Sequence, residues 1–215
     1  MFKKKKLLNL GTKYFDLWKK NLKKNNCKLI NYKKIGEIFR KKENDLIVSL
    51  YDTYIKKKTT RVNRYITIVK PSVIIVPIIY FSKEVYTMLV SQIRVYDGKE
   101  ILEFPAGGID FGVKPIDAAL NELKEELHLS LKKKDLKYLH SSPIMTEPSC
   151  TSGASYFFYF KLKVDKKFIN KFHLKKTGNK FFGEKIKIII KKMNNLHCYN
   201  SASIHVGLNL VRKYI

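Results

Sequence analysis

Three glutamates, Glu122, Glu125 and Glu126, are the residues of this chain whose types and spacing best suit chemistry. On a helix, spacings of three and four residues place their carboxylates on one side, with Cβ atoms about 5–6 Å apart. Carboxylates this close repel one another unless a cation lies among them. Because hard divalent ions prefer oxygen ligands, the pattern predicts a site for Mg²⁺ or Mn²⁺.

The glutamates end a longer stretch that we expect to run from a strand through a glycine-containing loop into a helix. The loop contains Gly107, Gly108 and Gly112, where the backbone can approach a ligand closely, and the helix is predicted to begin near Pro115. The alternative is a solvated acidic helix face. The loop and the basic character of the rest of the chain favour a functional site.

The chain is strongly basic, with 44 Lys and Arg against 18 Asp and Glu in 215 residues, a net charge of +26. Such a charge attracts polyanions and phosphorylated small molecules. The lysines are scattered through every segment, however, which is more typical of biased composition than of a binding groove. RNA binding is therefore open but not favoured.

Compartment and membrane association are constrained by the cysteines and the apolar runs. The cysteines Cys27, Cys150 and Cys198 are widely spaced, which argues against a disulfide framework or a zinc site and favours a reducing compartment. The basic start is not followed by the apolar run of a signal peptide, and residues 73–81 are too short to span a bilayer. We expect a cytoplasmic protein without membrane association, with organelle targeting by the basic start left open.

Periodicity predicts an N-terminal part, residues 1–70, and a main domain, residues 71–215. The first contains an amphipathic helix over 12–24, with Thr12 as a possible cap, and antiparallel strands at 28–32, 35–40, 46–55 and 61–69. In the second we expect strands at 73–80, 85–95, 138–145, 155–164 and 183–190. A loop or short helix at 166–182 and a closing helix at 201–214, capped by Ser201 or Ser203, complete the main domain.

The glycine–glutamate stretch resembles the signature of Nudix hydrolases, G-x5-E-x7-R-E-U-x-E-E-x-G-U, where U is a bulky aliphatic residue. The signature can be placed without gaps from Gly107 and is matched by Glu122, Glu125 and Glu126. The preceding E-F-P-A-G, residues 103–107, and S-Q-I-R, residues 91–94, resemble the branch that hydrolyses ADP-sugars such as ADP-ribose.

The resemblance implies an α/β fold, an α/β/α sandwich around a mixed sheet with a small N-terminal antiparallel β subdomain. It implies that Glu122, Glu125, Glu126 and the Ala106 carbonyl hold Mg²⁺ or Mn²⁺. Gly107 and Gly108 would contact the substrate. The reaction implied is hydrolysis of the diphosphate of a nucleoside-diphosphate sugar to AMP and a sugar phosphate, by a homodimer whose N-terminal sheet reaches the partner subunit.

Arg94 is a candidate for binding substrate phosphate. An arginine beside a carboxylate–metal site can hold phosphate with two hydrogen bonds, although a solvated arginine at a strand end is the alternative. The resemblance places Arg94 in the motif of the ADP-sugar branch and so favours the phosphate role.

The sequence departs from the family pattern at four positions, three in the signature and one in the loop that follows it. Val113 replaces the first glutamate, and Asn121 replaces the arginine that orients the metal ligands, so we expect looser geometry. His128 replaces a glycine and predicts a different helix exit. Gly153 stands where a catalytic glutamate is expected, which leaves Glu147 as the candidate base in that loop.

Two alternatives keep the fold and change the function. A Nudix fold that has lost catalysis would bind nucleotide or RNA, as the net charge and the four departures suggest. Hydrolysis of capped RNA or dinucleoside polyphosphates would keep the chemistry, but E-F-P-A-G counts against it.

Overall fold

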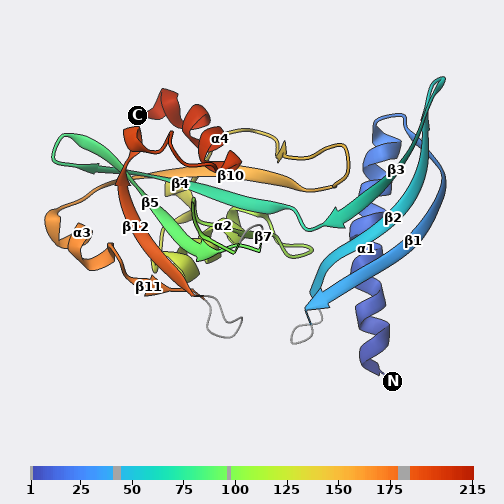
Figure 1. Cartoon of the computed structure of the whole chain (residues 1–215), viewed down its shortest axis with the longest axis horizontal. Coiled ribbons are helices and arrows are strands. Elements are labelled where there is room, and N and C mark those ends of the chain that lie inside the picture. Colours follow the sequence, from blue (N-terminus) through green and yellow to red (C-terminus); the bar gives the residue numbers. More distant parts are fainter. Residues whose placement is uncertain (1, 41–44, 96–97, 179–184) are drawn as a thin grey trace. The chain divides into compact units, whose positions relative to one another are not determined.

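The computed structural model describes residues 2–40, 45–95, 98–178 and 185–215, and side chains for 13–39, 48–95, 98–178 and 185–215 (Figure 1). The described chain forms two compact units. The first comprises Met1–Pro71, Asp110–Gly112 and Met145–Ser155, and the second comprises Ser72–Ile109, Val113–Ile144 and Tyr156–Ile215. Two short segments that sequence reasoning placed in the main domain therefore group with the N-terminal residues.

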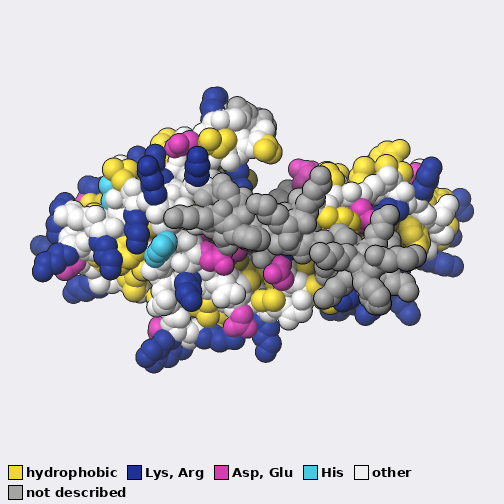
Figure 2. Space-filling model, turned by 90° about the horizontal axis from the view of Figure 1, so that it is seen from below, with side chains coloured by type: hydrophobic (Ala, Val, Ile, Leu, Met, Phe, Trp, Pro, Cys, Tyr) yellow, Lys and Arg dark blue, Asp and Glu magenta, His cyan; other side chains and the backbone are white. Residues whose placement is uncertain are grey.

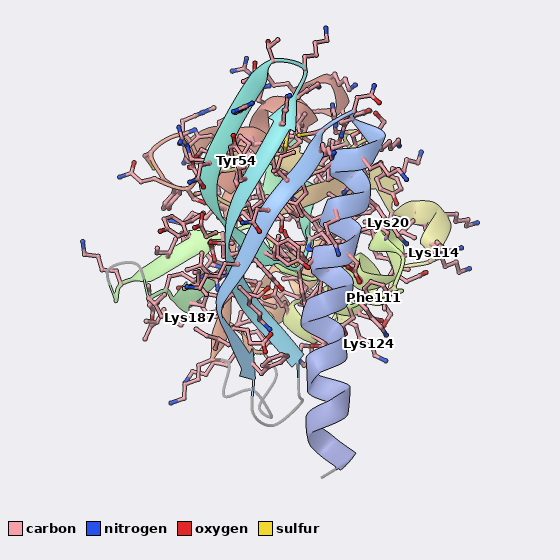
Figure 3. The ribbon with its side chains drawn as sticks, turned by 90° about the vertical axis from the view of Figure 1, so that its right-hand side faces the viewer. Lys20, Tyr54, Phe111, Lys114, Lys124 and Lys187 are labelled. Carbon is pink, nitrogen blue, oxygen red and sulfur yellow. The ribbon has the colours of Figure 1, made fainter. Side chains whose placement is uncertain are left out.

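The first unit is a helix against a three-stranded antiparallel sheet (Figure 1). Its elements are α1 (Phe2–Lys24), β1 (Lys28–Arg40), β2 (Asp45–Lys57) and β3 (Thr60–Val69). Tyr14 and Phe15 of α1 pack with Tyr51 and Ile68 of the sheet, and the Phe15 and Tyr51 rings stack with centroids 3.9 Å apart. Lys20 of α1 and Tyr54 of β2 are labelled in Figure 3.

Two predictions for this unit are wrong in detail. The helix begins at Phe2 rather than at Thr12, since the segment contains no proline and a single glycine is tolerated within a helix. The predicted strands 28–32 and 35–40 are one strand, β1, because the charged residues between them lie at an irregularity of the pairing near Gly36 instead of in a turn.

The segment Met145–Ser155 is fixed to β3 by hydrogen bonds. The Thr67 N–H donates to the Cys150 carbonyl at 2.7 Å, and the Ser152 N–H donates to the Thr67 carbonyl at 2.9 Å. The Ser152 hydroxyl lies 3.1 Å from the Val69 nitrogen. These bonds give the loop a defined backbone within the first unit.

The second unit is built on a nine-stranded sheet with the order β11-β12-β5-β4-β10-β8, to which β6, β7 and β9 add at β5, β4 and β10. The strands are β4 (Ser72–Phe81), β5 (Glu84–Ile93), β6 (Glu100–Glu103), β7 (Ala106–Gly108), β8 (Lys137–Tyr138), β9 (Ile144–Met145), β10 (Ala154–Lys163), β11 (Lys176–Thr177) and β12 (Ile186–Lys192).

Helices cover both faces of this sheet (Figure 1). On one face α2 (Pro115–Glu126) and α3 (Lys166–Phe172) pack, and on the other α4 (Ala202–Val211) packs. Successive side chains of β4 point to opposite faces of the sheet, so Val73, Ile75 and Ile79 face α2. By the same alternation, Ile74, Val76 and Ile78 face α4. The predicted α/β/α sandwich with an N-terminal antiparallel subdomain is confirmed.

One prediction for the second unit is wrong, one is confirmed in part, and one concerns residues outside those that the structure describes. The expected strand 138–145 is two short strands, β8 and β9, separated by bends. The cause is the intervening Ser-Ser-Pro segment, which favours a turn. The His140 ring stabilises this segment, since its Nδ1 lies 2.7 Å from the Ser142 carbonyl oxygen. Ser201 is the N-cap residue of α4, as predicted, but its side chain makes no capping hydrogen bond, and its hydroxyl contacts that of Ser203 at 2.9 Å. The expected strand start at Gly183 lies outside the described residues.

Positive side chains are spread over the visible face of the molecule rather than gathered over one element (Figure 2). This distribution agrees with the scattered lysines of the sequence. Among the described helices none combines the length and the apolar character needed to cross a bilayer.

Candidate active site

The helix α2 carries the three predicted glutamates. It begins at Pro115, as the sequence predicts, since proline suits the first helical turn, where its missing N–H is not needed. Ala118, Ala119 and Leu123 bury one side of the helix against the sheet. This packing fixes the adjacent side, which carries Glu122 and Glu126, against the strand β7.

Glu126 is a buried carboxylate held against the E-F-P-A-G segment. Its side chain is only 5% exposed, and Oε2 accepts the Ala106 N–H at 3.0 Å. The main chain of the same residue is held from the other side, because the Thr177 hydroxyl donates to the Glu126 carbonyl at 2.6 Å. Glu126 is thus a buried carboxylate that the backbone of the E-F-P-A-G segment holds in place.

Glu122 lies directly over Gly107. A Cβ atom added at Gly107 would stand 1.8 Å from Glu122 Oε1 and 2.0 Å from its carboxylate carbon. The absence of a side chain at Gly107 is therefore what leaves room for the carboxylate. Two acidic groups, one turn apart on α2, thus converge on the backbone of Ala106 and Gly107.

Glu125 is exposed, and no group of three or more Asp, Glu, His or Cys side chains in the described part of the chain is arranged to hold a metal ion as it stands. The structure therefore brings two of the three predicted ligands together. Their oxygen atoms, beside the Ala106 backbone in a cradle that a Cβ atom would fill, are the donors that a hard divalent ion prefers. The residues present fit such an ion.

The helix exit at His128 differs from the prediction. His128 adopts φ of 52°, the left-handed conformation that usually favours glycine at a helix end, so the expected different exit is wrong. Both the Leu127 and the Leu129 N–H donate to the Leu123 carbonyl, at 3.1 and 3.0 Å, and Leu127 is fully buried. These contacts hold the turn although the side chain disfavours it.

The ring of His128 is harder to protonate in the folded chain. Partial burial, together with the positive charge of Lys175, lowers the pKa of His128 below its ordinary value. The exit from α2 is therefore a place where acid opposes folding.

Arg94 forms an ion pair with Glu103. The Arg94 Nε and Nη2 atoms each lie 2.7 Å from Glu103 Oε2. Gln92 Nε2 is 3.4 Å from the same oxygen. In the sheet Glu103 pairs with Val90, which faces α2, so this charged group lies on the same face as the acidic residues of α2. A phosphate contact by Arg94 stays a prediction.

The remaining predicted positions have varied surroundings. Gly108 pairs with Ser72 at the end of β7, while Asn121 and Val113 are exposed. In the first unit, Glu147 is exposed and its Oε1 accepts from the Ser149 hydroxyl at 2.8 Å. A Cβ atom at Gly153 would lie 3.1 Å from Val69 Cγ2.

Two residues that hold other parts of the site were not predicted from the sequence. Glu103 was predicted only as part of a motif, because its ion pair with Arg94 depends on the pairing of β5 with β6. Thr177 carried no signal, since a single threonine in a basic segment is unremarkable until its hydroxyl reaches the end of α2.

Comparisons with known proteins show a likeness in sequence and a likeness in fold. No family model matches the chain. A relative in Arabidopsis thaliana, "Nudix hydrolase 14, chloroplastic", is 33% identical over 127 residues, which cover 55% of this chain and 41% of the relative. The match thus spans well under half of that protein's length.

In structure the chain resembles an ADP compounds hydrolase known from a crystal structure. The TM-score is 0.60 at 16% sequence identity, and the likeness covers 88% of this chain and 94% of that chain. At this identity the likeness establishes the fold.

Proposed function

We propose that this chain, a relative of the Nudix hydrolases in sequence and fold, hydrolyses the diphosphate of a nucleoside-diphosphate sugar to AMP and a sugar phosphate. The observation that carries the proposal is the convergence of Glu122 and Glu126 on the backbone of Ala106 and Gly107. The names of the two similar proteins, a Nudix hydrolase and an ADP compounds hydrolase, support the reaction class and an ADP-containing substrate.

Glu122, Glu125 and Glu126, with the Ala106 carbonyl, are the residues that would hold Mg²⁺ or Mn²⁺. When bound, such an ion neutralises a diphosphate and lowers the pKa of a water molecule that attacks phosphorus. The protein's part is to orient the carboxylates. The Ala106 N–H does so for Glu126 through its hydrogen bond to Oε2.

Arg94, Gly107 and Gly108 are proposed to meet the substrate. Glu103 fixes the Arg94 guanidinium through Nε and Nη2, so Arg94 is oriented before a phosphate arrives. Glu147 is proposed as the general base, because it is the carboxylate of the loop where the family places one. Both assignments rest on the resemblance together with the chemistry of these side chains.

The proposal includes a reducing compartment and a homodimer. The cysteines Cys27, Cys150 and Cys198 are free thiols, which suits the cytoplasm and also the interior of an organelle such as the one named for the Arabidopsis relative. Exposed apolar residues on β1 and β3 support a partner at the N-terminal sheet.

The test is product formation from ADP-ribose and ADP-glucose with Mg²⁺ or Mn²⁺, using Glu126→Gln and the control Asp117→Asn. Asp117 lies on the same helix and pairs with Lys133 at the surface, 2.7 Å away. We expect AMP release, a loss of kcat/KM of about 10²-fold or more in Glu126→Gln, and little change in the control. No turnover, or equal rates for the wild-type chain and Glu126→Gln, would refute hydrolysis.

The alternative is a Nudix fold that binds nucleotide or RNA without turnover. It is favoured by the exposed Asn121, which cannot brace the ligands as an arginine would, and by the net charge of +26. Affinity for a single-stranded RNA that falls steeply with salt and does not respond to Mg²⁺, in a chain without hydrolysis, is the outcome that would establish it.

A further inference from the structure

A cavity lies in the second unit, and its lining includes none of the glutamates of α2. It has a volume of about 870 Å³ and is bordered by β5, β6, β12, the residues after α3, and the segment 199–201 before α4. This size falls in the range of about 300–1,000 Å³ that is typical of small-molecule sites.

The sheet separates this cavity from the candidate active site. Ser91, Leu102 and Ile189 belong to its lining. Leu102 and Ile189 pack with the apolar cluster under α4, and Ser91 pairs directly with Leu102 across the sheet. Because side chains alternate along a strand, the cavity opens on the α4 face, whereas Glu122 and Glu126 lie on the α2 side.

The lining carries an excess of positive charge. Lys99, Lys187 and Lys191 contribute three ammonium groups, against the single carboxylate of Glu100. Glu100 accepts from the Ser91 hydroxyl at 2.8 Å, while Lys187 Nζ stands 3.8 Å from it, longer than a strong charged hydrogen bond. Lys187 is therefore within reach of Glu100 without being tightly held by it.

A histidine adds a defined donor to the same lining. The Ile190 N–H donates to His173 Nδ1 at 3.1 Å. A nitrogen that accepts this bond carries no proton, so the proton of the neutral ring is on Nε2. His173 thus carries its N–H donor on Nε2, and the residue belongs to the lining of the cavity.

We propose that this cavity binds a small phosphorylated molecule, with Lys187, Lys191 and the His173 Nε2–H at the phosphate and the apolar residues Leu102 and Ile189 beneath the rest of the ligand. Scattered surface lysines would attract anions anywhere on the chain. Here they border a hollow with an apolar floor, and that combination retains a phosphorylated organic molecule rather than any anion.

The test measures AMP and adenosine binding to the full chain by calorimetry in EDTA, which keeps divalent ions from the carboxylates. The pocket variant is Lys187→Gln with Lys191→Gln. The control with the same loss of charge is Lys20→Gln with Lys24→Gln on α1, and Lys20 and Lys187 are labelled in Figure 3. A third variant, Glu126→Gln, changes only the candidate active site.

We expect saturable AMP binding that the pocket variant weakens about tenfold or more, since two charged hydrogen bonds are lost. The control pair and Glu126→Gln keep wild-type affinity, and adenosine shows no saturation over the same range. The proposal is overturned if AMP does not saturate, if both lysine pairs weaken it equally, or if Glu126→Gln abolishes it. Because this experiment measures binding and not hydrolysis, a result that excludes the AMP site does not bear on the proposed hydrolysis.

Discussion

At the residue scale, the contact between Glu122 and Gly107 explains why a glycine stands at this point of the loop. The φ angle of Gly107 is not in the left-handed region, so a turn does not require the glycine. What requires it is the carboxylate, which occupies the space of a Cβ atom. The end of a glutamate side chain can move, so a larger residue would displace the carboxylate more readily than the strand.

Replacing Gly107 by alanine is therefore expected to leave the fold intact and to lower the affinity for Mn²⁺ by about tenfold or more, in the range found when residues that orient metal ligands are changed. Titration of free Mn²⁺ by electron paramagnetic resonance measures this. Gly36→Ala is the control, because nothing lies within 4 Å of a Cβ atom there. Unchanged Mn²⁺ affinity in Gly107→Ala would contradict the role given to Glu122.

His128 is a residue whose backbone conformation is strained. A histidine in the left-handed conformation is strained relative to glycine, and the buried Leu127 and the partly buried Leu129 on either side hold it there. His128→Gly should raise the free energy of unfolding by about 0.5–1 kcal/mol, the relief being partly offset by the greater freedom of glycine in the unfolded chain. Urea denaturation measures it, and equal or lower stability would show that the turn is not strained.

The same residue predicts a pH dependence. Burial and Lys175 lower the pKa of folded His128, whereas in the unfolded chain it stays near the ordinary value of 6.5. As pH falls through 6.5 the unfolded chain takes up the proton first, so stability is complete above this pH and declines below it. Stability measured between pH 7.5 and 5.5 should fall less steeply in His128→Gly than in the wild-type chain. Parallel curves would rule His128 out as the source.

At the element scale, α4 determines where the E-F-P-A-G segment lies. A Cβ atom at Gly207 of α4 would stand 2.6 Å from the Phe104 ring and 3.0 Å from Val76. Phe104 is completely buried, so it cannot move aside as a surface side chain would. The close approach of α4 thus fixes Phe104, two residues before the Ala106 backbone that Glu126 contacts.

Gly207→Ala is expected to destabilise the chain by about 1–2 kcal/mol, because overpacking in a core costs about 1–3 kcal/mol and exceeds the gain of about 1 kcal/mol in helix propensity. Thermal or urea unfolding measures the change. Asn209→Ala, at an exposed position of the same helix, should be neutral or slightly stabilising. A stabilised Gly207→Ala would mean that α4 is not closely packed on Phe104.

At the scale of the whole molecule, the first unit exposes apolar side chains that its own helix does not cover. Ile38 is 59% exposed and Tyr65 62% exposed on the strands β1 and β3. The exposed side of a three-stranded sheet with such residues is suited to a partner. This supports the proposed homodimer through the N-terminal sheet.

Sedimentation analysis should give a dimer for the wild-type chain and a monomer for Ile38→Lys with Tyr65→Lys, since buried lysines at an interface are strongly unfavourable. Ile93→Lys, at a residue that is 70% exposed in the other unit, is the control and should stay dimeric. A wild-type monomer, or a dimer that survives both lysines, would exclude this sheet as the interface.

The sequence by itself determined the features that depend on local pattern. The start of α2 at Pro115 followed from proline chemistry, and the buried strands followed from their apolar runs. The acidic positions on one helix followed from spacing alone. These properties depend on neighbours a few residues away, so they can be read without the fold.

Only the tertiary structure decided what depends on contacts between distant residues. It paired Glu103 with Arg94, placed the Thr177 hydroxyl on the end of α2, and set Glu122 over Gly107 while leaving Glu125 exposed. It also showed His128 in a conformation that its side chain disfavours. Spacing along a chain does not reveal strand register or the packing that supports a strained residue, because both arise from residues brought together by folding.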